Sequence, residues 1–355
     1  MTNDAYAALT ERLDFPGSER LRLILTALMT PEQARIAEAL PGTPAEVAGK
    51  TGAPAGRVKE QLDDLFFKGV AFVRGDFGKR EYFRFARNIV QLHDAAQASR
   101  MLDVTKDRKF YELWHDFCLN EMYPALARHF QSLERPQFRI VPAKKAIQGL
   151  DGVLPGEDFH ELLRAQELIA VVPCSCRYRT TAVGEPCAQT REPEQWHCLQ
   201  FGRGADYAIK RGSGRQLSLK EALELCDKIE GDGLLHIWDN NTSMTGINTS
   251  CQCCCDCCEN FVAMARANLN PGTLCEKSRY LAYVDVDECI GCQDCLSRCQ
   301  FDAIEIECPE ESKEYKAAVD PEKCFGCGAC VATCASGALK MKAIRPPEHI
   351  PPPAV

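Results

Sequence analysis

Residues 289–299 read CIGCQDCLSRC, and residues 324–334 repeat the same cysteine spacing as CFGCGACVATC. In each run, gaps of two, two and three residues separate four cysteines. Glycines at 291, 326 and 328 give the backbone the freedom for a tight turn, so three successive sulfurs can face one centre. Three thiolates presented in this way suit one face of an iron–sulfur cubane. The repeat therefore predicts two such clusters.

Over residues 280–343 the pattern resembles bacterial ferredoxins that carry two [4Fe–4S] clusters. In that family the fourth cysteine of each run ligates the cluster of the other run. The resemblance implies one cluster on Cys289, Cys292, Cys295 and Cys334, and a second on Cys324, Cys327, Cys330 and Cys299. Short strands are expected to flank each half, at 280–286 with 303–307 and at 317–319 with 338–342.

The chain departs from the family pattern after each fourth cysteine. The proline that usually stands there is Gln300 in the first half and Ala335 in the second. Each half thereby loses a rigid turn and keeps one more backbone N–H. This change affects the expected reduction potential and stability of the clusters, but the ligands that predict the clusters are all present. The charged loop between the runs holds Cys308, interpreted as a spare thiol. Zinc is the competing interpretation of a cysteine quartet, but the doubled spacing is rarely a zinc pattern.

Cysteine is the outlier in the composition, with 22 among 355 residues, and every one except Cys118 lies at or beyond Cys174. The first residues lack the basic and then apolar pattern of an export signal, and no stretch approaches a membrane-spanning length. We therefore expect a cytoplasmic protein with reduced thiols, which favours metal binding over disulfides. Residues 276–335 carry 13 Asp and Glu against 6 Lys and Arg, a balance that disfavours nucleic acid and suits a basic protein partner.

A second concentration of cysteines, residues 251–258, reads CQCCCDCC. Adjacent side chains diverge, so one turn of chain can present only two or three of these thiols to a common centre. Cys174 and Cys176, taken as alternate residues at a strand end, would point the same way, and Arg177 and Arg179 would offset thiolate charge. A subset of nine cysteines is the predicted additional metal site: Cys174, Cys176, Cys187, Cys198, Cys251, Cys253, Cys254, Cys257 and Cys258. One cluster, two clusters and zinc all remain compatible with this set.

The order of motifs from about 170 to 343 is similar to that of uncharacterised "4Fe–4S dicluster" proteins of anaerobic bacteria and archaea. The motifs are PCSCR at 173–177, HCLQFG at 197–202, SLKEALEL at 218–225, GLLHIWDN at 233–240 and then the two cysteine-rich segments. This resemblance implies low-potential electron transfer beside a partner oxidoreductase. His160, His197 and His236 are possible ligands, His197 most of all because it stands beside Cys198, although an ordinary structural role is favoured for each.

The N-terminal region has a different character. Thr30-Pro31 and Thr43-Pro44 predict two helix starts, each with a threonine cap and a proline in the first turn. Residues 70–74 and 81–85 alternate in the manner of a β-hairpin. Helices followed by a hairpin resemble a winged helix-turn-helix by pattern alone.

The predicted architecture is α+β and has three parts and a tail. Residues 1–90 form a winged-helix-like module, 91–275 a helical and then cysteine-rich middle domain, and 276–343 a two-[4Fe–4S] ferredoxin domain. Residues 344–355 are a proline-rich tail, expected to be extended and not necessarily ordered.

The favoured function is electron transfer, as an iron–sulfur protein or as a subunit that serves a partner oxidoreductase. No general-base constellation supports a catalytic assignment. One alternative is a redox-sensing DNA-binding regulator, but its presumed recognition helix places Glu60, Asp63 and Asp64 beside its basic residues, a poor face for phosphate. The other alternative is an enzyme with a catalytic metal centre in the middle domain.

Overall fold

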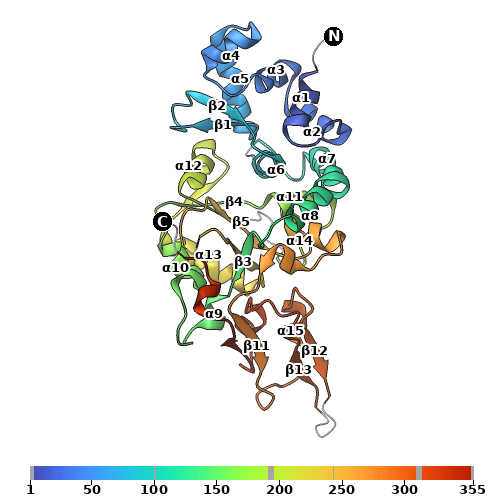
Figure 1. Cartoon of the computed structure of the whole chain (residues 1–355), viewed down its shortest axis with the longest axis vertical. Helices are drawn as coiled ribbons and strands as arrows, with labels where there is room; N and C mark the ends of the chain where they lie inside the picture. The colour runs from blue at the N-terminus through green and yellow to red at the C-terminus, as the bar shows by residue number, and fades with distance from the viewer. Residues whose placement is uncertain (1–3, 100, 191–195, 243, 309–313, 353–355) are drawn as a thin grey trace.

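The computed structural model describes residues 4–99, 101–190, 196–242, 244–308 and 314–352. They form an elongated molecule in which the N-terminal helices, a middle built on two sheets and the C-terminal cysteine module follow one another along the long axis (Figure 1). Helices and strands are mixed throughout, in agreement with the predicted α+β class.

Helices and a β-hairpin make up the N-terminal part. They are α1 (Ala5–Arg12), α2 (Glu19–Leu28), α3 (Pro31–Glu38), α4 (Pro44–Thr51), α5 (Ala55–Lys68), β1 (Ala71–Arg74) and β2 (Tyr82–Phe85). Thr30 and Thr43 cap α3 and α4 through reciprocal capping boxes, so both predicted helix starts are confirmed. In the hairpin Ala71 pairs with Phe85. The order α3, α4, α5 and hairpin is the one on which the winged-helix resemblance rests, and that resemblance stays a prediction.

The hydrophobic core continues from these helices into the next group. That group comprises α6 (Ile89–Gln97), α7 (Arg108–Phe117), the π-helical turn η1 (Cys118–Met122), α8 (Tyr123–Gln131) and α14 (Glu259–Arg266). Leu25 and Phe66 from the N-terminal part belong to the same buried cluster as Trp114, Phe117 and Phe261. The N-terminal part and the middle therefore share one core.

Two four-stranded sheets form the middle. The first runs β6–β4–β5–β8 and is antiparallel, while the second runs β10–β3–β7–β9 with only β10 and β3 parallel. The strands are β3 (Phe138–Val141), β4 (Ile169–Pro173), β5 (Trp196–Phe201), β6 (Arg215–Leu217), β7 (Leu235–Asp239), β8 (Thr249–Ser250), β9 (Gln252–Cys253) and β10 (Cys275–Glu276). Only Cys251 separates β8 from β9, so the chain passes from one sheet to the other at the start of the cysteine run.

Short helices connect and cover these sheets. They are α9 (Lys144–Ile147), η2 (Pro155–Glu157), α10 (Phe159–Arg164), α11 (Ser175–Val183), α12 (Gly202–Arg211), α13 (Leu219–Gly231) and η3 (Pro271–Thr273). The capping box of Ser218 and Glu221 opens α13. Helix α12 is not predicted, because its glycines weaken the helical signal. Gly204 is required there, since a Cβ atom would lie 2.4 Å from the carbonyl oxygen of Asn248.

The C-terminal module contains two small antiparallel ribbons and two short helices. Its elements are β11 (Tyr280–Val284), α15 (Asp294–Arg298), β12 (Ile304–Glu307), β13 (Lys316–Val319), α16 (Ala329–Ala332) and β14 (Leu339–Ala343). All four predicted strands are present. They pair across the two halves, β11 with β14 and β12 with β13, so each ribbon holds the first half against the second.

The module is anchored firmly to the middle. A buried ion pair joins Arg279 Nη1 to Glu157 Oε2 at 2.6 Å, and the N–H of Ala143 donates to the carbonyl oxygen of Cys327 at 2.8 Å.

Strand β10 belongs to the second middle sheet, so the predicted boundary between 275 and 276 falls inside a strand. The tail also differs from the expected extended segment, because it forms the turn η4 (Pro347–His349) and His349 Nε2 contacts the carbonyl oxygen of Lys277 at 2.7 Å.

Candidate metal centres

The eight cysteines of the C-terminal module fall into two neighbourhoods. Burial raises the pKa of Cys295, and the thiolates of Cys292, Cys289 and Cys334 raise it further, so these three sulfurs act on Cys295. Burial likewise raises the pKa of Cys330, with added contributions from Cys327, Cys299 and Cys324 and then from Cys295 of the first group. The three largest thiol contributions at each of these two residues come from the ligand set that the family resemblance implies for it, and the assignment of ligands to clusters stays a prediction.

Glycine is required at the turns that carry these cysteines. Gly291 and Gly326 both have φ of +67°, in the region that favours glycine. A Cβ atom at Gly291 would lie 2.3 Å from the carbonyl oxygen of Tyr315, and one at Gly326 would lie 2.1 Å from that of Tyr280. The turns can therefore wrap closely only because no side chain stands there.

Six cysteines of the middle form a closed ring, here called the six-thiol ring. Each thiol contacts two others through its side chain, in the order Cys174, Cys176, Cys258, Cys253, Cys251, Cys198 and back to Cys174. The Sγ atoms of Cys258 and Cys253 are 3.4 Å apart. The ring unites three segments that are distant in sequence, since Cys198 lies on β5 opposite Val172 of β4, and β8 pairs with β5 just before Cys251.

The pKa values of the ring alternate around it. Side-chain contacts with neighbouring thiols lower the pKa of Cys174 and Cys258 well below their usual value, and lower that of Cys251 to about 7. The same kind of contact raises the pKa of the three thiols between them, Cys176, Cys198 and Cys253. The ring thiols therefore interact strongly with one another. This electron-rich, buried donor set is of the kind that metal ions order and neutralise.

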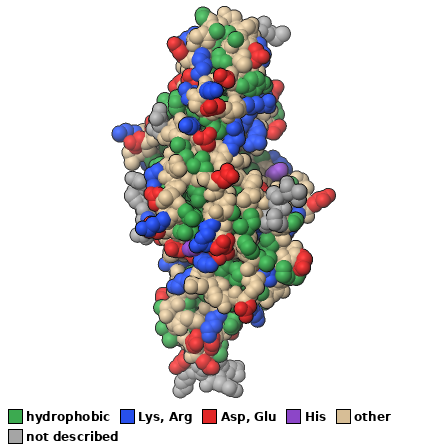
Figure 2. Space-filling model, turned by 90° about the vertical axis from the view of Figure 1, so that its left-hand side faces the viewer, with side chains coloured by type: hydrophobic (Ala, Val, Ile, Leu, Met, Phe, Trp, Pro, Cys, Tyr) green, Lys and Arg blue, Asp and Glu red, His purple; other side chains and the backbone are tan. Residues whose placement is uncertain are grey.

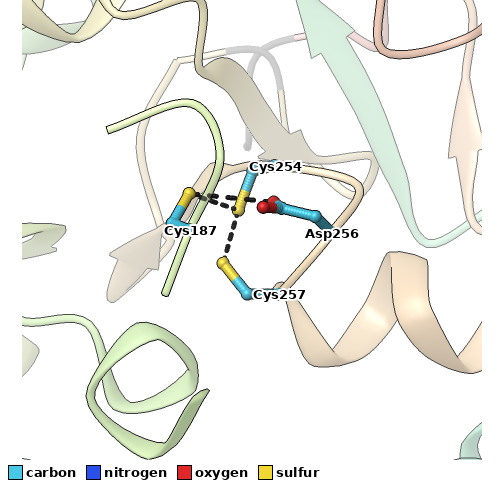
Figure 3. A group of neighbouring side chains, drawn as sticks. All are labelled: Cys187, Cys254, Asp256 and Cys257. Carbon is cyan, nitrogen blue, oxygen red and sulfur yellow. Dashed lines mark hydrogen bonds between the residues drawn. The ribbon is translucent and has the colours of Figure 1, made fainter. Parts of the chain in front are cut away.

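The remaining three predicted middle ligands form a separate group, here called the three-thiol group. Cys254 Sγ lies 3.6 Å from Cys187 Sγ and 2.8 Å from Cys257 Sγ. Asp256 completes the group, because its Oδ1 lies 3.7 Å from Cys187 Sγ (Figure 3). Sequence reasoning missed Asp256 as a donor, although its position inside the cysteine run was a signal. Three thiols and one carboxylate within 4.8 Å of one another suit a four-coordinate metal.

Arg177 stands between the two groups as a counter-charge. Its Nη2 donates to Cys254 Sγ at 3.5 Å and to the carbonyl oxygen of Gln252. Burial alone would lower its pKa, but the thiolates of Cys174 and Cys254 raise it well above the usual value. The predicted role of Arg177 in offsetting thiolate charge is therefore supported by its contacts.

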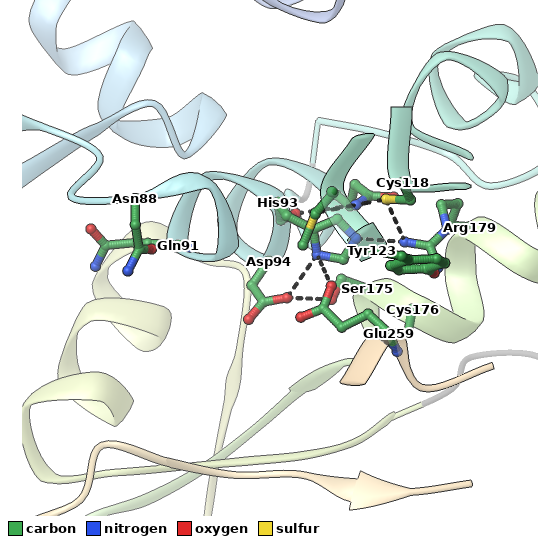
Figure 4. A network of polar contacts seen from close by, with 12 residues as sticks. Asn88, Gln91, His93, Asp94, Cys118, Tyr123, Ser175, Cys176, Arg179 and Glu259 are labelled. Atoms are coloured by element: carbon green, nitrogen blue, oxygen red, sulfur yellow. Dashed lines mark hydrogen bonds and ion pairs between the residues drawn. The ribbon is translucent and has the colours of Figure 1, made fainter. Parts of the chain in front are cut away.

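Arg179, expected to act alongside Arg177, belongs to a different network. Its Nη1 contacts Cys118 Sγ at 3.2 Å and His93 Nε2 at 2.6 Å (Figure 4). His93 Nδ1 lies 3.0 Å from carboxylate oxygens of both Asp94 and Glu259. These contacts tie α6 to α11 and α14 beside the six-thiol ring, and they give Cys118 and Arg179 a structural role.

The expected geometry of Cys174 and Cys176 is wrong. They are not alternate residues at a strand end, because β4 ends at Pro173 and Cys174 is the residue that precedes the first turn of α11. The backbone turns into a helix here, where side chains two apart do not share a face. Their thiols nevertheless meet, since one lies at the helix cap and the other in the first turn.

A further group of metal-binding residue types is fully buried but internally satisfied. His236 Nε2 lies 3.3 Å from Glu230 Oε1 and 3.5 Å from Cys226 Sγ. The backbone N–H of Lys144 donates to the same Glu230 oxygen at 2.7 Å, and the His236 ring stacks on Phe159. The group fits the structural role favoured for His236.

The comparisons with known proteins concern the C-terminal module. The sequence model of a family described as "4Fe-4S dicluster domain" matches residues 288–338. The chain therefore carries a ferredoxin-like iron–sulfur module in its C-terminal part. No curated protein and no solved structure matches the chain. Within the part of the chain that the structure describes, no helix combines the length and the apolar character needed to cross a membrane.

Proposed function

We propose that the protein is an electron carrier in which two [4Fe–4S] clusters link a partner oxidoreductase to further thiolate-bound metal in the middle. The observation that carries this proposal is the environment of Cys255. Burial raises its pKa, and thiolates from both sides contribute, Cys258 from the middle and Cys327 and Cys299 from the C-terminal module. The cysteine run and the second ligand set are therefore electrostatic neighbours, as redox centres in a relay must be.

The ligand assignment follows the two neighbourhoods of the C-terminal module. We assign the first cluster to Cys289, Cys292, Cys295 and Cys334, and the second to Cys324, Cys327, Cys330 and Cys299. The three largest thiol contributions to the pKa of Cys295, and likewise of Cys330, come from the other members of the same set, which supports this assignment. Thiolate ligation supplies each cluster with one-electron redox chemistry, whose potential depends on burial and hydrogen bonding. In this chain the second set is closer to the middle and the first set lies toward the exposed end.

The middle would hold two separate metal sites. We assign a further iron–sulfur centre to the six-thiol ring, because its donors are all sulfur and the clusters proposed for the C-terminal module lie beside the same cysteine run. The three-thiol group with Asp256 is a smaller site with a donor set that zinc or iron accepts. Arg177 contacts the smaller group and faces the charge of both.

The exposed end of the C-terminal module suits a protein partner. Ile290 is 72% exposed, and Val286 and Leu296 are exposed close to it in the sequence. Ile290 lies beside ligand residues Cys289 and Cys292 of the first set. Solvent-exposed apolar side chains within an acidic module favour docking on an apolar surface with a basic rim.

The structure does not favour DNA binding by the N-terminal part. Arg80 Nε pairs with Asp63 Oδ1 at 2.7 Å, and Arg57 pairs with Glu32 at 2.8 Å. Basic side chains already neutralised by carboxylates are poor phosphate ligands. A winged-helix-like module that contacts protein instead remains part of the proposal.

The test is metal analysis of the anaerobically purified full-length protein, with iron, sulfide and zinc counts and EPR. Cys253→Ser removes one ring member and Cys257→Ser one member of the three-thiol group. Cys255→Ser is the matched control, because it lies in the same run and outside both groups. We expect the first two variants to lose different metal contents while the control keeps the wild-type content. Wild-type protein with metal in the C-terminal module only would refute the middle sites.

A further inference from the structure

The six-thiol ring opens onto a cavity of about 500 Å³. All six ring cysteines line it, whereas only Cys254 of the three-thiol group does. From the ring, the cavity extends between α12 and α6 to the hairpin of the N-terminal part. Its volume lies in the range of small-molecule sites, and it reaches well beyond the ring itself.

Arginines line the end of the cavity that is remote from the ring. They are Arg84 on the hairpin, Arg87 just after it, and Arg203 and Arg211 on α12. Among the described residues, none of these four guanidinium groups lies within ion-pair distance of a carboxylate. Figure 2 shows Lys and Arg side chains gathered at the level where the hairpin meets the middle. Arg87 and Arg203 are exposed, so this concentration of cations without carboxylate partners runs from the mouth of the cavity inward. It favours an anionic ligand.

Of these arginines, Arg211 is buried and Arg84 is half-buried. Arg211 is 1% exposed, its Nη1 donates to Tyr207 Oη at 3.1 Å, and its Nε has no hydrogen-bond partner within the described structure. Burial lowers the pKa of Arg84 to about 10, and the nearby charge of Arg87 adds to this effect. A bound anion would therefore stabilise the positive charge of both guanidinium groups.

The cavity walls between the arginines are aromatic. Tyr207 stacks on Phe72 with ring centroids 5.1 Å apart, and the guanidinium of Arg203 lies 4.3 Å above the Phe77 ring. Arg84 lies in the same way over Phe72. A ligand that fits these walls needs an apolar, flat body as well as a charge.

The carboxylates that line the cavity lie at its ring end. Asp94 and Glu259 both contact His93 Nδ1 at 3.0 Å, and Ser175 Oγ donates to Asp94 at 2.8 Å. Asp94 lies on α6 with Asn88 and Gln91, which also line the cavity (Figure 4). Toward the hairpin the cavity is thus lined by arginines that donate to neutral oxygens and have no carboxylate partner among the described residues. Toward the ring it is lined by thiols, engaged carboxylates and Arg177.

We propose that this cavity binds a small organic anion, with its carboxylate or phosphate group held by Arg84, Arg203 and Arg211 and its apolar body directed toward the six-thiol ring. The inference deepens the proposed function, on which it rests for the metal in the ring, because it gives that centre a ligand of defined chemistry. The anion site itself depends only on side chains of this chain.

Calorimetric titration of the anaerobic full-length protein tests the site. Benzoate and phenyl phosphate serve as probes for the two anion types, and benzamide is the neutral control. We expect saturable binding of at least one anion at millimolar or lower concentration and no binding of benzamide. Arg84→Gln and Arg203→Gln should each weaken binding about tenfold or more, because each removes a charge-assisted contact.

Arg74→Gln is the matched control, since Arg74 lies on the same hairpin, over the Tyr82 ring, and does not line the cavity. Arg203 is exposed at the cavity mouth, so its substitution keeps the test valid if the Arg84 variant does not fold. Any of three results would overturn the inference. Benzamide could bind as well as the anions, both arginine variants could keep the wild-type affinity, or neither anion could show saturable binding. Iron counts on the same samples separate these outcomes from a failure of the proposed metal in the ring.

Discussion

Gln300 Oε1 accepts a hydrogen bond of 2.7 Å from the backbone N–H of Cys255, and Gln300 Nε2 donates to the carbonyl oxygen of Gly233. Gln300 stands where the ferredoxin pattern has proline. The departure from the family pattern therefore has a structural use, because a side-chain amide at this position links the C-terminal module to the cysteine run of the middle.

Gln300→Pro restores the family residue and removes both side-chain hydrogen bonds. Because each such bond contributes about 1 kcal/mol net, we expect a loss of about 2 kcal/mol in unfolding free energy. The matched control is Ala335→Pro, the equivalent change in the other half at an exposed position. Denaturant unfolding of both variants measures the difference, and equal stability of the two would contradict the linking role of Gln300.

The predictable part of the chain is the part where structure depends on local spacing. Thr30 and Thr43 start helices because capping needs only a few neighbouring residues. The two cysteine runs follow the same logic, since three ligands of each set lie within one turn of chain. The fourth ligand proposed for each set, Cys334 or Cys299, required knowledge of a family, because only the pairing of strands across the halves holds the two runs together.

The two thiol groups proposed as metal sites in the middle were predictable only as one set of candidate ligands. Cys253 and Cys254 are adjacent, as are Cys257 and Cys258, yet one member of each pair joins the six-thiol ring and the other joins the three-thiol group. Adjacent side chains diverge, so a split was foreseeable. Which cysteine goes where depends on how β9 enters the second sheet, and a two-residue strand leaves no periodic signal in the sequence.

Cys292→Ala should remove about half of the EPR signal of the C-terminal clusters, because Cys292 belongs to only one ligand set. Wild-type protein should contain at least about eight irons and about eight sulfides from this module, the content of two [4Fe–4S] clusters. Cys308→Ala is the control, since Cys308 is exposed and lies outside both proposed ligand sets. Four irons or fewer after full anaerobic reconstitution of the wild type would refute two clusters.

Glu230 should make the stability of the fold depend on pH. Burial alone would raise its pKa, but the hydrogen bond with His236 and the backbone N–H groups of Lys144 and Lys145 lower it below 4.5. Since the folded pKa lies below the unfolded one, the stabilisation is fully present above about pH 4.5 and is lost as the pH falls through the folded value.

Glu230→Gln should therefore lower the unfolding temperature at neutral pH, and the difference from wild type should shrink as the pH falls below 4.5. Calorimetry across this range measures it. Glu224→Gln, which removes a carboxylate from the exposed face of the same helix, is the control. A difference between wild type and Glu230→Gln that does not change with pH would contradict the lowered pKa.

The ion pair of Glu157 and Arg279 should be a main support of the contact between the C-terminal module and the middle. The two side chains are 1% and 6% exposed, and Tyr280 Oη also donates to Glu157 Oε2 at 3.3 Å. Glu157→Gln leaves the Arg279 charge buried without its partner, so we expect a loss of about 3 kcal/mol in unfolding free energy.

The pair of Arg135 and Glu276 is the comparison, because its arginine side chain is 47% exposed and water screens it. Glu276→Gln should cost less than about 1 kcal/mol. Denaturant unfolding of the full-length protein gives both values, and equal losses would show that burial does not decide the strength of this contact.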